Sequence, residues 1–356
     1  MSSFPVPDSA RRAAVRARML AAVSCLASAT ALLASLSACG GGGSDAPTPV
    51  PPSPTPVPSP APATPIAAQM SVPTPVGYDA ERLAAFNRLN EIRLSAGLGM
   101  VAQNALLDQA AQAHADWMIA NDAFVHEEAP GSTGFTGAHF WDRAEALGYL
   151  PVGGDEVMSS GASASAGVDA LVNTLYHRVG MLAFEPVDVG IGRSDATIGD
   201  VRTPLVMDMT RPGTDEVRGL GQAAQPGIQG VAIWPLDGAI SVPTRLGIES
   251  PNPIPGHDVS TLGTPVTLNV DRLQTIQVSS FVMTNVATGG TVPSRVVTSQ
   301  SDLNQLIPHS FVGLVPLLPL DPNVSYHVAF SGQSIAFPSA SAVDIRRDWT
   351  FTTGTH

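Results

Sequence analysis

The chain has 356 residues, of which 44% are hydrophobic and 13% charged, so it can form two domains of ordinary size and is too apolar to be disordered throughout. Its 18 basic residues, all arginines, are outnumbered by 30 acidic residues, and this balance argues against a nucleic acid as partner. Both cysteines, Cys25 and Cys39, lie near the amino terminus. Everything after Cys39 therefore lacks disulfides and thiolate metal sites.

The amino-terminal segment has the layout of a secretory signal peptide. Four arginines precede an apolar run from Met19 to about Leu36, and small residues follow it. The run ends in Leu36-Ser37-Ala38-Cys39-Gly40, which resembles a bacterial lipobox. We therefore predict a lipoprotein signal peptide at residues 1–39, with Cys39 lipidated after cleavage; an uncleaved anchor and an ordinary signal peptide are the alternatives.

The predicted lipidation of Cys39 also indicates where the protein is located. Acyl chains on Cys39 would hold the protein on a membrane, which is then its first partner. Gly40 stands where an acidic residue would favour retention at the inner membrane, so the sequence favours the outer membrane or cell surface of a bacterial envelope. Residues 40–77 are rich in proline and small residues, which predicts a disordered linker that holds the following domain away from the bilayer.

Residues 78–211 carry the patterns of a mixed helical and stranded domain. Apolar residues at helical spacing predict helices over Tyr78–Leu94, Asn104–Asn121, Phe140–Leu147 and Val168–Tyr176. Alternating patterns predict strands over Val187–Gly192 and Pro204–Met209. Helices combined with a few antiparallel strands indicate an α+β fold, layered helix, sheet, helix.

Seven short motifs in this region occur in the order seen in one family. They are Leu89-Asn90-x-x-Arg93, Ala113-His114-Ala115 with Met118, Phe124-x-His126, Asp142-Arg143 with Gly148-Tyr149, Glu156, His177-Arg178 and Val189-Gly190-Ile191-Gly192. Together they resemble the bacterial branch of the CAP superfamily (cysteine-rich secretory, antigen 5 and pathogenesis-related 1 proteins; also called SCP domains). The resemblance implies an α-β-α sandwich and a secreted protein.

The family has a cleft lined by two histidines and two acidic residues. By resemblance, His126 matches the first histidine, Glu156 the acid of a Gly-Glu-Asn motif, and His177 the second histidine. The chain departs from the pattern at Gly154-Asp155-Glu156-Val157, which lacks the asparagine. It departs again at Asn173-Thr174, where eukaryotic members carry an acid. The resemblance thus implies three cleft residues rather than four.

Three roles remain open for His126, Glu156 and His177. Two imidazoles and a carboxylate can bind a divalent metal such as zinc, can perform acid–base chemistry, or can form a hydrogen-bonded polar cluster. The sequence contains no Gly-x-Ser-x-Gly motif and no cysteine in this domain, so we name no catalytic residue and favour binding over catalysis.

Other polar residues of the domain fit structural roles. His114 lies on the apolar face of its predicted helix, which favours a core histidine. Arg143 and Arg178 are interpreted as structural, and Gly190 and Gly192 as positions that allow close packing of a strand. His139 could also line the cleft. Glu127 and Glu128 could be partner acids of His126, although solvated loop charges are the simpler interpretation of these two glutamates.

The remainder of the chain predicts an all-β domain. Residues 212–230 form a polar, glycine-rich connector, and seven short strand patterns follow in residues 231–356. This pattern resembles bacterial immunoglobulin-like β-sandwich modules, a resemblance at the level of fold that says little about function.

The sequence supports three functional hypotheses. The first is a surface-anchored binding module whose cleft holds a divalent metal or a small apolar ligand such as a lipid or sterol, as the family resemblance implies. The second is a protease-like hydrolase that uses the same histidines and glutamate. The third is a structural or adhesive protein whose partners are other proteins of the cell envelope.

Overall fold

The computed structural model describes residues 67–161, 163–196, 203–213, 230–337 and 339–355. Several predicted features lie outside these residues: the signal peptide, the lipidation site at Cys39, and most of the linker and the connector. Residues Pro62–His356 form one compact unit. Within the described ranges, none of the helices is both long and apolar enough to span a bilayer.

The first half of the unit is built on a four-stranded sheet with the strand order β1-β3-β4-β2. β1 pairs with β3 in parallel, whereas β4 pairs with β3 and β2 in antiparallel fashion. The strands are β1 (Ala102–Gln103), β2 (Asp155–Ser160), β3 (Asp188–Arg193) and β4 (Pro204–Thr210). β4 is buried along its whole length, as expected of a central strand covered on both faces.

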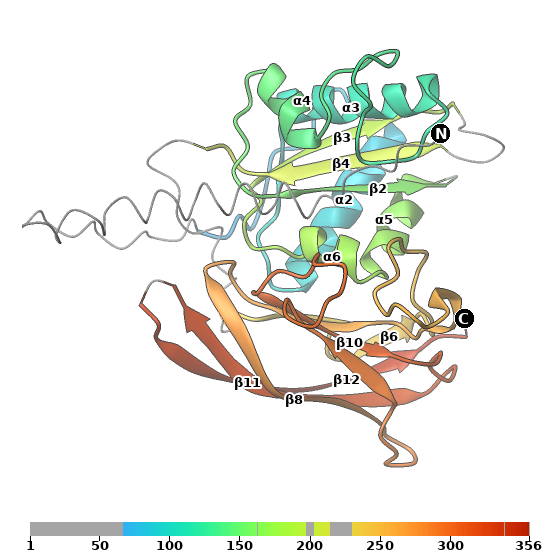
Figure 1. Cartoon of the computed structure of the whole chain (residues 1–356), viewed down its shortest axis with the longest axis vertical. Helices are drawn as coiled ribbons and strands as arrows, with labels where there is room; N and C mark the ends of the chain where they lie inside the picture. The colour runs from blue at the N-terminus through green and yellow to red at the C-terminus, as the bar shows by residue number, and fades with distance from the viewer. Residues whose placement is uncertain (1–66, 162, 197–202, 214–229, 338, 356) are drawn as a thin grey trace, which may run out of the picture. The chain divides into compact units, whose positions relative to one another are not determined.

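Helices cover both faces of this sheet (Figure 1). They are α2 (Ala80–Ser95), α3 (Ala105–Ala120), α4 (Phe140–Ala146), α5 (Ala164–Val172) and α6 (Tyr176–Met181). α3 and α4 lie on one face, and α2, α5 and α6 on the other. Asp79 and Asn104 accept hydrogen bonds from the first free amides of α2 and α3, which explains where these helices begin. The α+β fold and its α-β-α layering are therefore confirmed.

The predicted helix over Val168–Tyr176 is wrong, because two helices meet there. α5 ends at Val172 and α6 begins at Tyr176. Between them, the Thr174 hydroxyl donates to the carbonyl of Leu171, and the amides of Leu175 and Tyr176 donate to the carboxylate of Glu249. These hydrogen bonds satisfy backbone groups where the chain leaves one helix and enters the next. The Glu249 carboxylate that accepts two of them comes from far along the chain.

The second half of the unit contains two four-stranded sheets, with the orders β5-β7-β10-β9 and β6-β12-β11-β8. The strands are β5 (Ala232–Trp234), β6 (Ala239–Val242), β7 (Val266–Asn269), β8 (Gln274–Asn285), β9 (Ser294–Val297), β10 (Phe311–Pro316), β11 (Ser325–Ala336) and β12 (Ala342–Thr353). A short 3-10 helix covers Val259–Thr261. Residues from both sheets share one apolar core, and β11 alternates between buried and half-buried positions as expected for a strand on a core. The all-β character of this half is confirmed.

Three details of this half differ from the seven strand patterns expected. The pattern at residues 243–250 is not a strand, and its one bridge joins Arg245 to Gly263. The pattern at residues 231–240 contains β5 and the start of β6, which belong to different sheets. β10 was not expected, because all of its residues are buried and its sequence therefore does not alternate. The division into domains at residues 78–211 and 231–356, and the likeness to immunoglobulin modules, stay predictions.

Candidate functional site

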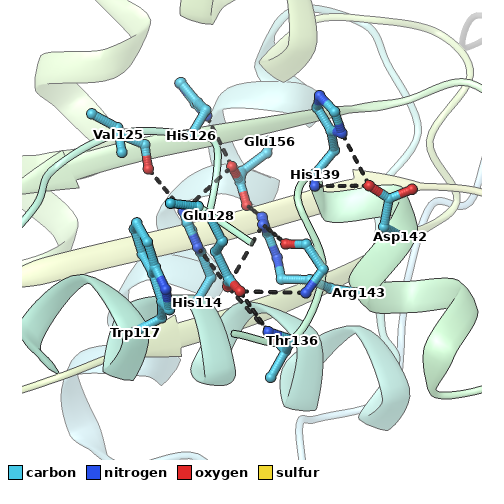
Figure 2. Close-up of polar contacts among 12 residues, drawn as sticks. His114, Trp117, Val125, His126, Glu128, Thr136, His139, Asp142, Arg143 and Glu156 are labelled. Carbon is cyan, nitrogen blue, oxygen red and sulfur yellow. Dashed lines mark hydrogen bonds and ion pairs between the residues drawn. The ribbon is translucent and has the colours of Figure 1, made fainter. Parts of the chain in front are cut away.

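A buried ionic cluster lies between helix α3 and the sheet (Figure 2). Its members come from separate elements: His114 from α3, Glu128 from the loop after α3, Arg143 from α4, Glu156 from β2 and Asp208 from β4. All five are buried. Because isolated charges are costly to bury, their mutual contacts determine whether this part of the domain folds.

Arg143 is the cation at the centre of the cluster. It donates a hydrogen bond to Glu156 Oε2, and its Nη1 lies 3.8 Å from Glu128 Oε1. Burial alone would raise the pKa of Glu156, but the charge of Arg143 and the hydrogen bond from His126 lower it to about 2. Glu156 is therefore an anion at any physiological pH.

His126 connects this cluster to solvent. Its Nδ1 lies 2.9 Å from Glu156 Oε1, and half of its side chain (50%) is exposed whereas Glu156 is buried. Desolvation lowers the pKa of His126, but the hydrogen bond and charge of Glu156 raise it more, and the net shift is upward. The ring is thus biased toward its protonated form, with Nδ1 donating to Glu156 and Nε2 free to donate to another group.

His114 is the core histidine that the sequence predicts. It is fully buried and stacks on Trp117, with a distance of 5.7 Å between ring centroids. Its ring nitrogens face the carbonyl of Val125 at 3.0 Å and Glu128 Oε1 at 3.1 Å. Burial lowers the pKa of His114, and this effect outweighs the opposing charge of Glu156. It holds the loop that carries His126 against α3.

Asp208 is a second carboxyl group beside Glu156. The two residues are direct partners in the β2–β4 pairing. Burial first, and the charge of Glu156 second, raise the pKa of Asp208 well above its usual value. Both effects favour the neutral form of the Asp208 carboxyl group in the folded protein, where both of its oxygens are buried without a hydrogen-bond partner among the described residues.

The surface around His126 combines aromatic and acidic side chains. His139 contacts Glu127, the residue next to His126, at 3.2 Å and also Asp142 at 3.0 Å. Its ring stacks on Trp141 with centroids 4.3 Å apart, and Trp141 is 41% exposed. The exposed residue Val125 adjoins His126 on the other side. The exposed apolar side chain of Val125 therefore adjoins His126, and the exposed Trp141 lies against His139, which contacts the next residue, Glu127.

Two of the three predicted cleft residues contact each other directly, and the third has other partners. His126 and Glu156 are paired, but the contacts of His177 are with Thr174 at 2.9 Å and Glu249 at 3.6 Å. Among the residues that the structure describes, no three His, Cys, Asp or Glu side chains are placed to share a metal ion. Glu156 is also committed to Arg143. The donor set therefore does not fit a metal ion, and zinc binding stays a prediction that this geometry does not support.

A comparison with known protein families matches part of the chain to one family. Residues 86–201 match the family model described as "CAP: Cysteine-rich secretory protein family". This part of the chain is a CAP domain. None of the curated proteins is significantly similar to the chain.

Two solved bacterial structures are similar to it. An outer surface protein from Borrelia burgdorferi shares 16% identity over 36% of this chain and 90% of that one, with a TM-score of 0.31. An extracellular protein containing a SCP domain from Bacillus anthracis str. Ames shares 18% identity over 37% of this chain, with a TM-score of 0.32. The match spans only 40% of the length of the B. anthracis protein.

Sequence reasoning missed four members of the polar sites in and around the CAP domain: Glu128, Arg143, Asp208 and Glu249. Arg143 was interpreted as structural, and Glu128 as a solvated loop charge, whereas it is buried. The one available signal was Asp208, a lone acid between methionines in an otherwise apolar strand. A charged residue in such a strand needs a buried partner.

The raised pKa of Asp208 leads to a testable prediction. We expect Asp208→Asn to stabilise the CAP domain at pH 7. The asparagine amide is neutral in the folded and the unfolded chain, so folding no longer includes the cost of protonating a carboxyl group. The amide can also donate a hydrogen bond to Glu156. Each unit by which folding raises a carboxyl pKa costs about 1.4 kcal/mol above that pKa. Thermal unfolding followed between pH 7 and pH 3.5 measures the effect. The advantage of the variant should shrink as the pH falls toward about 3.9, the ordinary aspartate pKa, below which Asp208 is protonated in both states. A variant less stable than wild type at pH 7 would show that Asp208 is ionised.

Proposed function

We propose that this protein is a surface-anchored bacterial binding module, and that its CAP domain binds a small apolar ligand with an anionic or hydrogen-bond-accepting head group. The observation that carries the proposal is the state of His126, which is half exposed, biased toward protonation by a buried carboxylate, and next to the exposed apolar residue Val125. Such a ring can donate to a ligand's oxygen while the apolar surface binds its body.

The rest of the cluster supports binding over catalysis. Glu156 is engaged by Arg143 and His126, and Glu128 accepts hydrogen bonds from the amides of Thr136 and Gly137. These contacts hold the loop and ring in place before a ligand arrives, which lowers the entropic cost of binding. The lipobox-like sequence at Cys39 supports attachment to the outer membrane or cell surface, and the matched family of secretory proteins supports export.

A fatty acid such as palmitate is a suitable probe. We expect the full chain to bind palmitate more tightly than hexadecanol, and the change in Trp141 fluorescence on titration to report it. His126→Ala should weaken palmitate binding about tenfold, which corresponds to the loss of about 1.4 kcal/mol for a charge-assisted hydrogen bond. Because protonation of His126 favours an anionic head group, affinity should fall as the pH rises through the raised pKa of this residue.

A matched control is available in the second half of the chain. His327 is a comparably exposed histidine on strand β11, far from His126 in the sequence, so His327→Ala should leave affinity unchanged. Equal affinity for palmitate in the wild type and His126→Ala would contradict the proposed site. Equal binding of palmitate and hexadecanol would contradict recognition of the head group.

A further inference from the structure

Glu249, from the second half of the chain, reaches the turn between α5 and α6. Its Oε2 accepts a hydrogen bond from the amide of Leu175 at 2.9 Å, and its Oε1 accepts one from the amide of Tyr176 at 2.5 Å. The carboxylate is fully buried and lies near the buried Arg178, whose pKa burial lowers to about 9 while Glu249 opposes this shift. Two backbone amides and a nearby cation therefore surround the Glu249 carboxylate.

The same carboxylate lies beside His177, whose proton position can be deduced from its neighbours. The Thr174 hydroxyl donates its only proton to the carbonyl of Leu171 at 2.7 Å, so Thr174 Oγ1 can only accept from His177 Nδ1, 2.9 Å away. Glu249 Oε1 lies 3.6 Å from the same nitrogen, which is too long for a hydrogen bond but close enough for its charge to favour a proton there. Both neighbours of Nδ1 are acceptors, so Nδ1 carries the proton.

A neutral ring protonated at Nδ1 has its lone pair at Nε2. The side chain of His177 is 19% exposed, and within the described ranges Nε2 makes no hydrogen bond. We propose that Thr174, His177 and Glu249 form a second polar site, in which the two halves of the chain together hold His177 with Nε2 as a hydrogen-bond acceptor for a ligand's hydroxyl or N–H group. Thr174 and Glu249 act as positioning residues.

This site differs from the one at His126 in chemistry and in origin. His126 is biased toward donation, whereas His177 presents an acceptor, and the contacts of the two rings share no residue. The site also gives the second half of the chain a role, because the CAP domain alone lacks the carboxylate that faces His177. The inference does not depend on the proposed binding of an apolar ligand at His126.

Nitrogen NMR of the full chain with labelled histidines tests the proton position directly, because protonated and unprotonated ring nitrogens resonate far apart. At a pH where the ring is neutral, we expect His177, assigned with a His177→Gln variant, to carry its proton on Nδ1. Thr174→Val keeps the shape but removes the acceptor, and should move part of the population to the Nε2-protonated form. Thr350→Val, at an exposed position of β12, is the matched control and should change nothing. A wild-type His177 protonated on Nε2, or a spectrum unaffected by Thr174→Val, would overturn the proposal.

Chemical modification tests whether the lone pair is accessible. Diethylpyrocarbonate reacts with an unprotonated imidazole nitrogen, so mass spectrometry of the modified full chain should show His177 modified and the fully buried His114 unmodified. Glu249→Gln should slow modification at Nε2 of His177 several-fold, because it removes the carboxylate that faces Nδ1 and so reduces the population of rings with the lone pair at Nε2. Protection of His114 in this variant shows that the fold is intact. Protection of wild-type His177 equal to that of His114 would contradict an accessible acceptor.

Discussion

Replacing Arg143 by methionine is expected to cost about 3–5 kcal/mol of stability, the range found when one partner of a buried ion pair is removed. The methionine fills similar volume but leaves Glu156 buried without the cation that lowers its pKa, beside Asp208 and near Glu128. Thermal unfolding of the full chain at pH 7 measures the loss. Without Arg143, the carboxylate of Glu156 would take up a proton more readily. The difference in stability between the variant and the wild type should therefore narrow as the pH falls toward about 4.3, the usual pKa of a glutamate.

Two further variants separate the buried charge from simple loss of packing. Arg143→Met combined with Glu156→Gln removes both charges and should recover part of the lost stability. Arg88→Met is the matched control, because Arg88 makes ion pairs of similar length with Glu91 and Asp169 but on the surface. That variant should cost less than about 1 kcal/mol. If Arg143→Met were as mild as Arg88→Met, the buried cluster would not be the electrostatic centre of this domain.

The sequence was most informative where local physical chemistry decides the structure. The segments that became α2 and α3 have strong helical periodicity and an Asp or Asn cap, and their predicted ends differ from the observed ones by one or two residues. β2 and β10 were missed, because both are buried on both faces and neither shows the alternation that identifies a strand. The break between α5 and α6 depends on Glu249, which no local pattern reveals.

The candidate site was predicted only in part, for a related reason. Resemblance to a family identified His126 and Glu156, and these two residues do form a hydrogen bond. Arg143, whose charge lowers the pKa of Glu156, and Asp208, which pairs with Glu156 across β2 and β4, come close to it only in the tertiary structure. The sequence did not reveal that an acid from the second half of the chain lies beside His177, and its place in one cleft with His126 and Glu156 stays a prediction. Contacts between residues so far apart in the sequence form only in the tertiary structure, so no spacing pattern in the sequence reveals them.

Substitution of Gly190 by alanine should be the other severe change in the domain. A Cβ at this position of β3 would lie 2.0 Å from the carbonyl carbon of Leu107 and 2.4 Å from the amide nitrogen of Asp108. Both are backbone atoms of α3, so no side chain can rotate away and the whole helix must shift. Gly192 is in the same situation against Ala111, which confirms that these glycines allow close packing, here of a helix on the strand.

The expected loss for Gly190→Ala is about 3 kcal/mol, the upper end for overpacking, because a displaced α3 would also strain the hydrogen bond from the Ile191 amide to Asp108. The same helix carries His114, so the variant should also disturb the loop that holds His126 and weaken any ligand that binds there. Thermal unfolding and the palmitate titration measure the two effects. Gly161→Ala is the matched control, since nothing lies within 4 Å of a Cβ there and its backbone conformation is ordinary. That change should be neutral or slightly stabilising. Equal stability of the two alanine variants would show that α3 can move away from β3 at little cost in free energy. In that case the ionic cluster alone would fix the position of His126.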